Sequence, residues 1–180
     1  MTAIAHPLAG GWNANRIGIM AILTVDDHNK GVGAIVMNLQ ALETTLRFFF
    51  FRKNGEKSAF RDAKKGEFVP GSSLVSHKQL RKWIRQYNSC LTKEEFAEYS
   101  ITEDIVEVRD ALAHGRLLAR EPPKLPYTLW NFKEQSNGKV EVRFHEVLTA
   151  DWLKKTIGEI DNAKETVVAC FKARGYKGLS

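Results

Sequence analysis

The sequence predicts a mainly α protein, an antiparallel bundle of four principal helices with one β-hairpin inserted before the last helix. Apolar residues recur three and four positions apart through most of the chain, which is the period of an α-helix. Over about residues 127–147 the period changes to two, which is typical of a strand whose faces differ in polarity. Fairly short connections between the helices favour antiparallel neighbours.

The composition indicates one globular domain. A chain of 180 residues, 43% hydrophobic and 27% charged, is long enough to bury its own core. We expect a poorly ordered leader over residues 1–26 and a single helical domain over 27–180. The apolar run at 17–25 lacks the basic start of a signal peptide and is shorter than the roughly 20 residues of a membrane span. With Cys90 and Cys170 expected as reduced thiols, these features predict a cytoplasmic protein without a membrane partner.

The first helix should begin at Asp27 or Asn29, either of which can cap it, and its apolar stripe begins at Val32. Four consecutive phenylalanines at 48–51 make its end apolar all round, which favours core packing over a ligand pocket, with subunit contact as a variant. Between residues 52 and 72 basic residues and a Pro-Gly pair break the period, which predicts a mobile basic loop. That loop could help to hold RNA, but a solvated connection is the favoured interpretation.

The middle of the chain contains sequence signals for the starts of further helices. A second helix is expected over 73–91, with an apolar stripe on one face and basic residues on the other. The patterns T-x-x-E at 92–95 and S-x-x-E at 100–103 match capping boxes, which predict a short helix and then the third principal helix. Gly115 should end that helix in a left-handed conformation, although residues 116–119 could prolong it by a turn.

The end of the chain should contain the hairpin and the last helix. Residues 140–145 alternate between apolar and polar side chains and follow an Asn-Gly pair at 137–138, a strong hairpin signal. The segment 127–134 is the expected partner strand. Thr149 should cap a last helix whose apolar positions keep the helical period to about Arg174.

The third principal helix contains the pattern with the clearest chemistry, R-D-A-L-A-H-G at residues 109–115. Arginine has a charged planar group that suits phosphate oxygens, and histidine as a residue type exchanges protons near neutral pH. Residues five apart lie about 140° apart around a helix, so Arg109 and His114 should flank a cleft. A complete site then needs groups from elsewhere, such as the same helix of a second subunit. The net charge of +6 favours a polyanionic partner such as RNA.

This segment resembles the hallmark motif of the HEPN superfamily, R-x4-6-H with a polar residue after the arginine. The resemblance extends over most of the chain from about Val32 and implies a homodimer in which two motifs form a composite active site. It implies a metal-independent endoribonuclease without a cofactor, acting as a toxin or antiviral defence effector beside an antitoxin or regulatory protein. The alternative is a non-catalytic HEPN module that binds a nucleotide, RNA or a protein partner.

The resemblance assigns roles to the motif residues. His114 would act as general base or acid when the ribose 2′-OH attacks the adjacent phosphorus and leaves a 2′,3′-cyclic phosphate. Arg109 would hold the phosphate, and Asp110 would orient His114 or Arg109. Some HEPN toxins carry a tyrosine that is modified two positions beyond the histidine, but here Arg116 stands there and adds a cation beside the site. If the resemblance is set aside, the two residues have a purely structural interpretation. His114 then interacts with the helix dipole, and Arg109 pairs with a buried acid.

Glu43 lies on the apolar stripe of the first helix, where an unpaired carboxylate would be costly. Two partners are open for it: Arg109, which it would align for phosphate, or another basic residue in a structural ion pair. His77 and His145 are expected as isolated surface residues. The chain contains no H-E-x-x-H, Walker loop, dinucleotide fingerprint or cysteine cluster, so neither a metal nor a nucleotide cofactor is expected.

Overall fold

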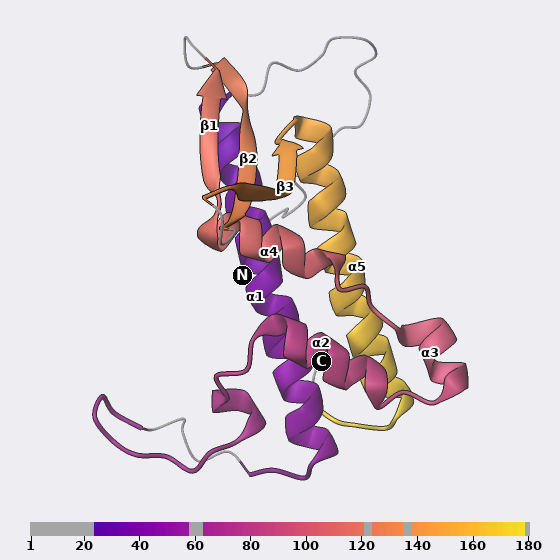
Figure 1. The fold of residues 1–180 in the computed structure, drawn as a ribbon. Coiled ribbons are helices and arrows are strands. Elements are labelled where there is room, and N and C mark those ends of the chain that lie inside the picture. The colour runs from indigo at the N-terminus through magenta and orange to yellow at the C-terminus, as the bar shows by residue number, and fades with distance from the viewer. Residues whose placement is uncertain (1–23, 58–62, 121–123, 135–137, 179–180) are drawn as a thin grey trace, which may run out of the picture.

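The computed structural model describes residues 24–57, 63–120, 124–134 and 138–178. Within these ranges the chain is mainly helical with a small antiparallel sheet, which confirms the predicted class (Figure 1). We expected a leader over residues 1–26, and residues 1–23 of it lie outside the described residues. The elements are α1 (Val25–Lys53), the 3₁₀ helix η1 (Ser73–Val75), α2 (Leu80–Ser89), α3 (Lys93–Tyr99), α4 (Asp104–His114), β1 (Arg116–Arg120), β2 (Lys124–Glu134), β3 (Val140–Val147) and α5 (Ala150–Ala173).

Helices α1 and α5 lie side by side and run in the same direction (Figure 1). Their starts meet, because a Cβ added to Gly31 would lie 2.8 Å from Cδ1 of Leu153. Their ends meet where the ring of Phe48 lies 6.0 Å from that of Phe171. The predicted antiparallel bundle is therefore wrong for this pair. The two helices are not neighbours in sequence, and the intervening elements, with α2 and α4 crossing α1, return the chain to the same end of the molecule.

Helix α1 begins one turn earlier than the sequence predicts. Oγ1 of Thr24 accepts a hydrogen bond from the backbone N–H of Asp27, and the Asp27 carboxylate accepts one from the Thr24 backbone. This reciprocal capping box places Asp27 at the third helical position instead of at the cap. Residues 25 and 26, which we expected in the leader, therefore form the first turn of α1.

The second predicted helix is broken in two, because only η1 and α2 are helical within residues 73–91. The Glu56 carboxylate accepts hydrogen bonds from both the backbone N–H and the Oγ of Ser73, at 2.5 and 2.6 Å. These bonds hold η1 near the end of α1, and an extended segment separates η1 from α2.

One of the two predicted capping boxes forms. Thr92 and Glu95 exchange the expected hydrogen bonds at the start of α3. The box predicted at 100–103 is wrong, because the Glu103 carboxylate binds Arg81 and Arg85 of α2 instead of a backbone N–H. Oγ1 of Thr102 accepts the hydrogen bond from the backbone N–H of Asp104, where α4 begins.

The strands form a three-stranded antiparallel sheet in the order β1-β2-β3. The strands expected over 127–134 and 140–145 lie within β2 and β3, which pair with each other. The possible helical extension at 116–119 is wrong, because these residues pair with β2 as β1. Asn137 of the predicted turn lies outside the described residues, and Gly138 has a left-handed φ of 72°. Thr149 caps the start of α5 as predicted, and Arg174 is the C-terminal cap that follows its last residue, Ala173.

The core lies between α1, α2, α4, α5 and one face of the sheet. The phenylalanine run contributes to it as the sequence predicts, with Phe49, Phe50 and Phe51 buried and Phe48 partly buried. Leu129 of β2 is 2% exposed and supplies the sheet's part of the core. Cys90 and Cys170 are both free thiols, as predicted.

An ion pair joins the start of α3 to the end of α5. Nε and Nη2 of Arg174 lie 2.8 and 2.6 Å from the two carboxylate oxygens of Glu95. The same guanidinium donates to the carbonyl of Cys90 at 2.9 Å and lies over the ring of Phe49. Hydrogen bonds from Arg174 and from the backbone of Thr92 lower the pKa of Glu95 to about 2.

Replacing Glu95 with glutamine should lower the free energy of unfolding by about 1–2 kcal/mol at pH 7, because a charge-assisted, two-point contact is lost. The folded pKa lies below the ordinary value of 4.5, so this stabilisation is present above pH 4.5 and disappears as the pH falls toward 2. Urea denaturation at several pH values measures it, with the exposed Glu94→Gln as the matched control. If the free energies of unfolding of the parent and Glu95→Gln differ by the same amount at every pH, the assignment is contradicted.

His28 of α1 is buried at 1% exposure beneath the sheet, with Tyr127 packed edge-on at 4.8 Å. Among the described residues neither ring nitrogen has a hydrogen-bond partner. Burial therefore lowers the pKa of His28 below its ordinary value of 6.5.

The unfolded chain should bind a proton at His28 more readily than the folded protein does. Stability is then complete above pH 6.5 and decreases as the pH falls below that value. We expect His28→Leu to lose less stability than the parent between pH 7 and pH 5, measured by urea denaturation. The exposed His77→Leu is the control and should keep the parent's pH dependence; identical profiles for all three proteins would refute the assignment.

Candidate functional site

Two of the predicted site residues lie at the junction where α4 passes into β1. His114 is the last residue of α4, and its side chain is exposed. It has no hydrogen bond or ion pair with any other residue that the structure describes. Arg116 is the first residue of β1 and is also exposed. An imidazole and a guanidinium are thus both accessible to a ligand at this junction.

Gly115 makes the junction possible by close approach of the backbone. Its φ is −79° and its ψ is −176°, so the predicted left-handed cap is wrong. The backbone N–H donates to the carbonyl of Ala111 at 2.7 Å, and an added Cβ would overlap the carbonyl oxygens of Ala111 and Trp130. Only glycine lets the end of α4 lie against the backbone of β2 at this distance.

Arg109 and Asp110 are held together on α4. Nη1 of Arg109 lies 3.0 Å from Oδ1 of Asp110, and Oδ2 of Asp110 lies 3.8 Å from Nη2 of Arg81. Asp110 therefore contacts Arg109 and forms no hydrogen bond with His114, the other partner that the sequence left open. The contact orients the Arg109 guanidinium and neutralises part of its charge.

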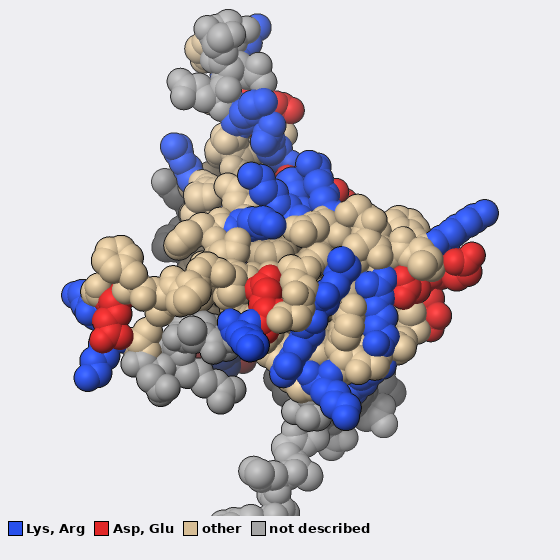
Figure 2. Space-filling view, turned by 90° about the horizontal axis from the view of Figure 1, so that it is seen from below, with Lys and Arg blue, Asp and Glu red and all other residues tan. Residues whose placement is uncertain are grey.

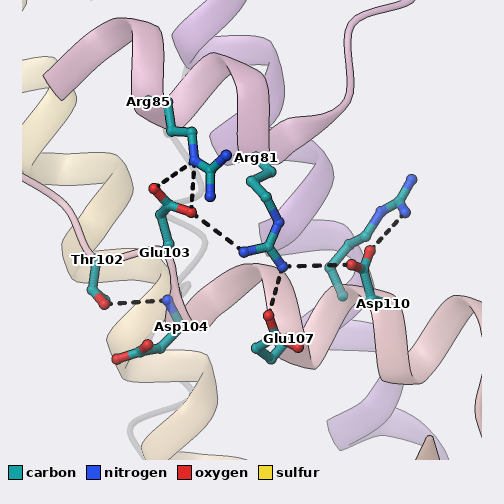
Figure 3. Close-up of polar contacts among 8 residues, drawn as sticks. Arg81, Arg85, Thr102, Glu103, Asp104, Glu107 and Asp110 are labelled. Atoms are coloured by element: carbon teal, nitrogen blue, oxygen red, sulfur yellow. Dashed lines mark hydrogen bonds and ion pairs between the residues drawn. The ribbon is translucent and has the colours of Figure 1, made fainter. Parts of the chain in front are cut away.

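The same carboxylate belongs to a larger ionic network between α2 and α4 (Figure 3). Arg81 binds Glu107 at 2.5 Å and Glu103 at 3.3 Å, and Arg85 binds Glu103 at 2.8 Å. Hydrogen bonding to Glu107 raises the pKa of Arg81. Two cations on the basic face of α2 are therefore used to fix α4, and they are not free for an outside anion.

Glu43 pairs with Arg47 of the same helix, at 2.5 Å, and not with Arg109. Arg47 also donates to the carbonyl of Leu74, which ties η1 to α1. This bears out the structural ion pair, one of the two partners left open for Glu43. The signal was the four-residue spacing from Glu43 to Arg47, which places the two side chains one turn apart.

Glu43 and Arg109 nevertheless line the same hollow, of about 320 Å³, between α1 and α4. Its walls are mostly apolar, and Val36 on its rim is partly exposed. His114 does not line it. The complete lining is Val36, Leu39, Gln40, Glu43, Leu80, Arg109, Leu112 and Ala113.

Figure 2 shows lysine and arginine side chains spread over the end of the molecule that is seen from below. Helices α1 and α5 finish at this end (Figure 1). Cations near helix C-termini interact favourably with the helix dipoles, which gives them a structural role in addition to attracting a polyanion. The exposed basic residues at these helix ends and on α2 are Arg52, Lys53, Lys82, Arg85, Lys172 and Lys177.

Sequence reasoning missed an aromatic cluster on β2 and β3. His145, expected to be isolated, lies with its ring 3.8 Å from that of Trp130. The rings of Trp130 and Phe132 are 5.7 Å apart and nearly parallel, at 7°. The W-x-F spacing in a predicted strand was the available signal, because residues two apart share a face of a sheet.

Comparisons with known proteins found no matching family model, curated protein or solved structure. In the part of the chain that the structure describes, no helix is both long and apolar enough to span a membrane. The same residues contain no group of three or more histidine, cysteine, aspartate or glutamate side chains placed to hold a metal ion.

Gly115→Ala should destabilise the protein by about 1–3 kcal/mol, because the added methyl group forces apart the backbones of α4 and β2. Gly33→Ala is the matched control, since nothing lies within 4 Å of a Cβ at that helical position. We expect the control to gain about 0.5–1 kcal/mol from reduced backbone entropy. Urea denaturation of both variants measures the contrast, and equal stability of the two would contradict the close approach.

Proposed function

We propose that this chain is a metal-independent endoribonuclease of HEPN type that works as a homodimer. The observation that supports this most is the exposed, unpartnered ring of His114 among the described residues, on the same helix as an arginine that is oriented by Asp110. A general acid or base must be free to meet the substrate, and a phosphate-binding guanidinium must be positioned before the substrate arrives. Both conditions are met on α4.

The reaction uses proton transfer and charge stabilisation alone. His114 accepts the proton of a ribose 2′-OH while the 2′-oxygen attacks the adjacent phosphorus. The bond from phosphorus to the 5′-oxygen of the next nucleotide breaks, and that oxygen takes a proton from a second imidazole, His114 of the other subunit. The products are a 2′,3′-cyclic phosphate and a 5′-hydroxyl. Arg109 and Arg116 are the cations available to the phosphate oxygens as negative charge develops.

The hollow between α1 and α4 supports a second copy as the partner that completes the site. A twofold contact uses the same patch on both chains, so it would bring two α4 helices together. Val36, which lines the hollow, supplies exposed apolar surface, and burial of such surface drives association. Action as a toxin or antiviral effector, under an antitoxin or regulatory protein, remains a prediction of the family resemblance.

The second candidate is a non-catalytic HEPN module that binds a nucleotide, RNA or a protein partner. The contact between Arg109 and Asp110 favours it, because a carboxylate on Arg109 leaves this guanidinium less charge to stabilise the negative charge that develops in a transition state. The two candidates differ in whether RNA is cut.

Purified parent protein should cleave a labelled mixed-sequence RNA in EDTA and leave 2′,3′-cyclic phosphate ends. His114→Ala should be slower by about 10²- to 10⁴-fold, because the proton-transfer group is lost. His77→Ala is the matched control, since His77 is an exposed histidine away from α4, and it should cleave at the parent rate.

Cleavage by His114→Ala at the parent rate would exclude the proposed role of the histidine. Absence of cleavage by the parent would favour the binding module. In that case Arg109→Ala should weaken RNA binding in a filter-binding assay.

A further inference from the structure

We propose that the outer face of the sheet is a stacking platform for the bases of single-stranded RNA. The identity of the ligand as RNA rests on the proposed function, whereas the platform itself rests on the geometry of the sheet. The residues that form it are Arg116 of β1, Trp130 and Phe132 of β2, and His145 of β3.

The strand register places these side chains on one face. Arg116 pairs with Trp130, and Trp130 pairs with His145, so the three form one row across the sheet. Directly opposed residues in an antiparallel sheet point to the same side. Leu129, the neighbour of Trp130 along β2, is buried on the opposite side, toward the helices. The row therefore lies on the face that points away from the core.

The aromatic rings of the platform contact one another and not the core. The rings of Trp130 and Phe132 lie parallel, and His145 lies against Trp130. Neither Trp130 nor Phe132 belongs to the core cluster of the described residues or packs against it, unlike Phe144 on the inner face. Trp130 and Phe132 are partly exposed and His145 is exposed, so the stack offers ring surface to another flat ring, and every nucleobase has one.

The charge and polarity of the face fit a nucleic acid. Arg116 stands at one end of the row and His145 at the other, and the apolar Leu118 and Val142 on the same face are 50% and 51% exposed. The Glu146 carboxylate belongs to the inner face, because Glu146 pairs with Leu129. Among the described side chains of the outer face there is thus no acid to receive Arg116. A twofold contact would apply this same face from both copies, so a second copy would bring Arg116 no acid from the described side chains, whereas a phosphate would neutralise it.

The position of the platform relates it to the motif helix. Gly115 holds the end of α4 against the Trp130 carbonyl, and His114 and Arg116 flank that glycine in sequence. A base stacked on Trp130 therefore has its own phosphates beside this junction. Bases in a duplex are already stacked on each other, so the platform selects single-stranded RNA and should show little base preference.

The test uses the His114→Ala protein, which prevents turnover, and a fluorescein-labelled single-stranded RNA of about 12 nucleotides, within the usual site sizes. Trp130→Leu keeps an apolar side chain but removes the ring, and we expect it to weaken binding about 10-fold in fluorescence anisotropy. Trp130→Tyr keeps a ring and should bind within about 3-fold of the parent. The exposed Phe68→Leu is the matched control and should bind as the parent does.

Equal RNA affinity of the His114→Ala protein with and without Trp130→Leu would overturn the platform. Absence of RNA binding by the His114→Ala protein would also overturn it. A Trp130→Leu protein that loses self-association in sedimentation and leaves RNA affinity unchanged would also overturn it, in favour of a contact between copies. Phe132→Leu, expected to weaken binding in the same direction, replaces Trp130→Leu if circular dichroism shows that variant to be unfolded.

The failure of the platform is distinguishable from the failure of the nuclease. No cleavage by the parent together with Trp130-dependent binding would refute the nuclease and support the platform. Cleavage by the parent with an unchanged KM in Trp130→Leu would support the nuclease and refute the platform.

Discussion

The burial of α1 against α5 in a parallel pair is the constraint on which the other elements depend. Helix α2 and the sheet cover other parts of α1: Trp83 of α2 packs on Phe50, and Tyr127 of the sheet packs on His28. A helix surrounded in this way must be apolar on several faces, as the phenylalanine run is. Because each buried aromatic side chain contributes about 1.5–3 kcal/mol, these contacts fix α1 and so the positions of α2, α4 and the sheet.

The cations of this protein are not equivalent, although the net charge treats them alike. Arg81, Arg85 and Arg174 bind carboxylates that hold helices together, so they act inside the fold. Arg109 forms an ion pair with Asp110. Arg116 is exposed and has no ion-pair partner among the described residues. Cations that are paired within the fold are less available to an outside anion than the net charge indicates.

The candidate site was only partly predictable. The R-x4-H spacing located Arg109 and His114 on one helix, because helical position follows from local sequence. The partner of Glu43 was left open between Arg109 and other basic residues, since a carboxylate on an apolar stripe can reach several of them. His145 was expected to be isolated because its partner Trp130 is fifteen residues away in sequence and adjacent only through strand pairing. Sequence periodicity assigns a face to a side chain but not the residue that meets it there.

Features that depend on a few neighbouring residues were determined by the sequence alone. They include the mainly α class, the box between Thr92 and Glu95, the cap at Thr149 and the place of the phenylalanines in the core. The tertiary structure decided the parallel direction of α1 and α5, the formation of β1 and the loss of Glu103 from its predicted box to the arginines of α2. Local preferences differ by only about 1 kcal/mol, so contacts between distant segments decide wherever they compete.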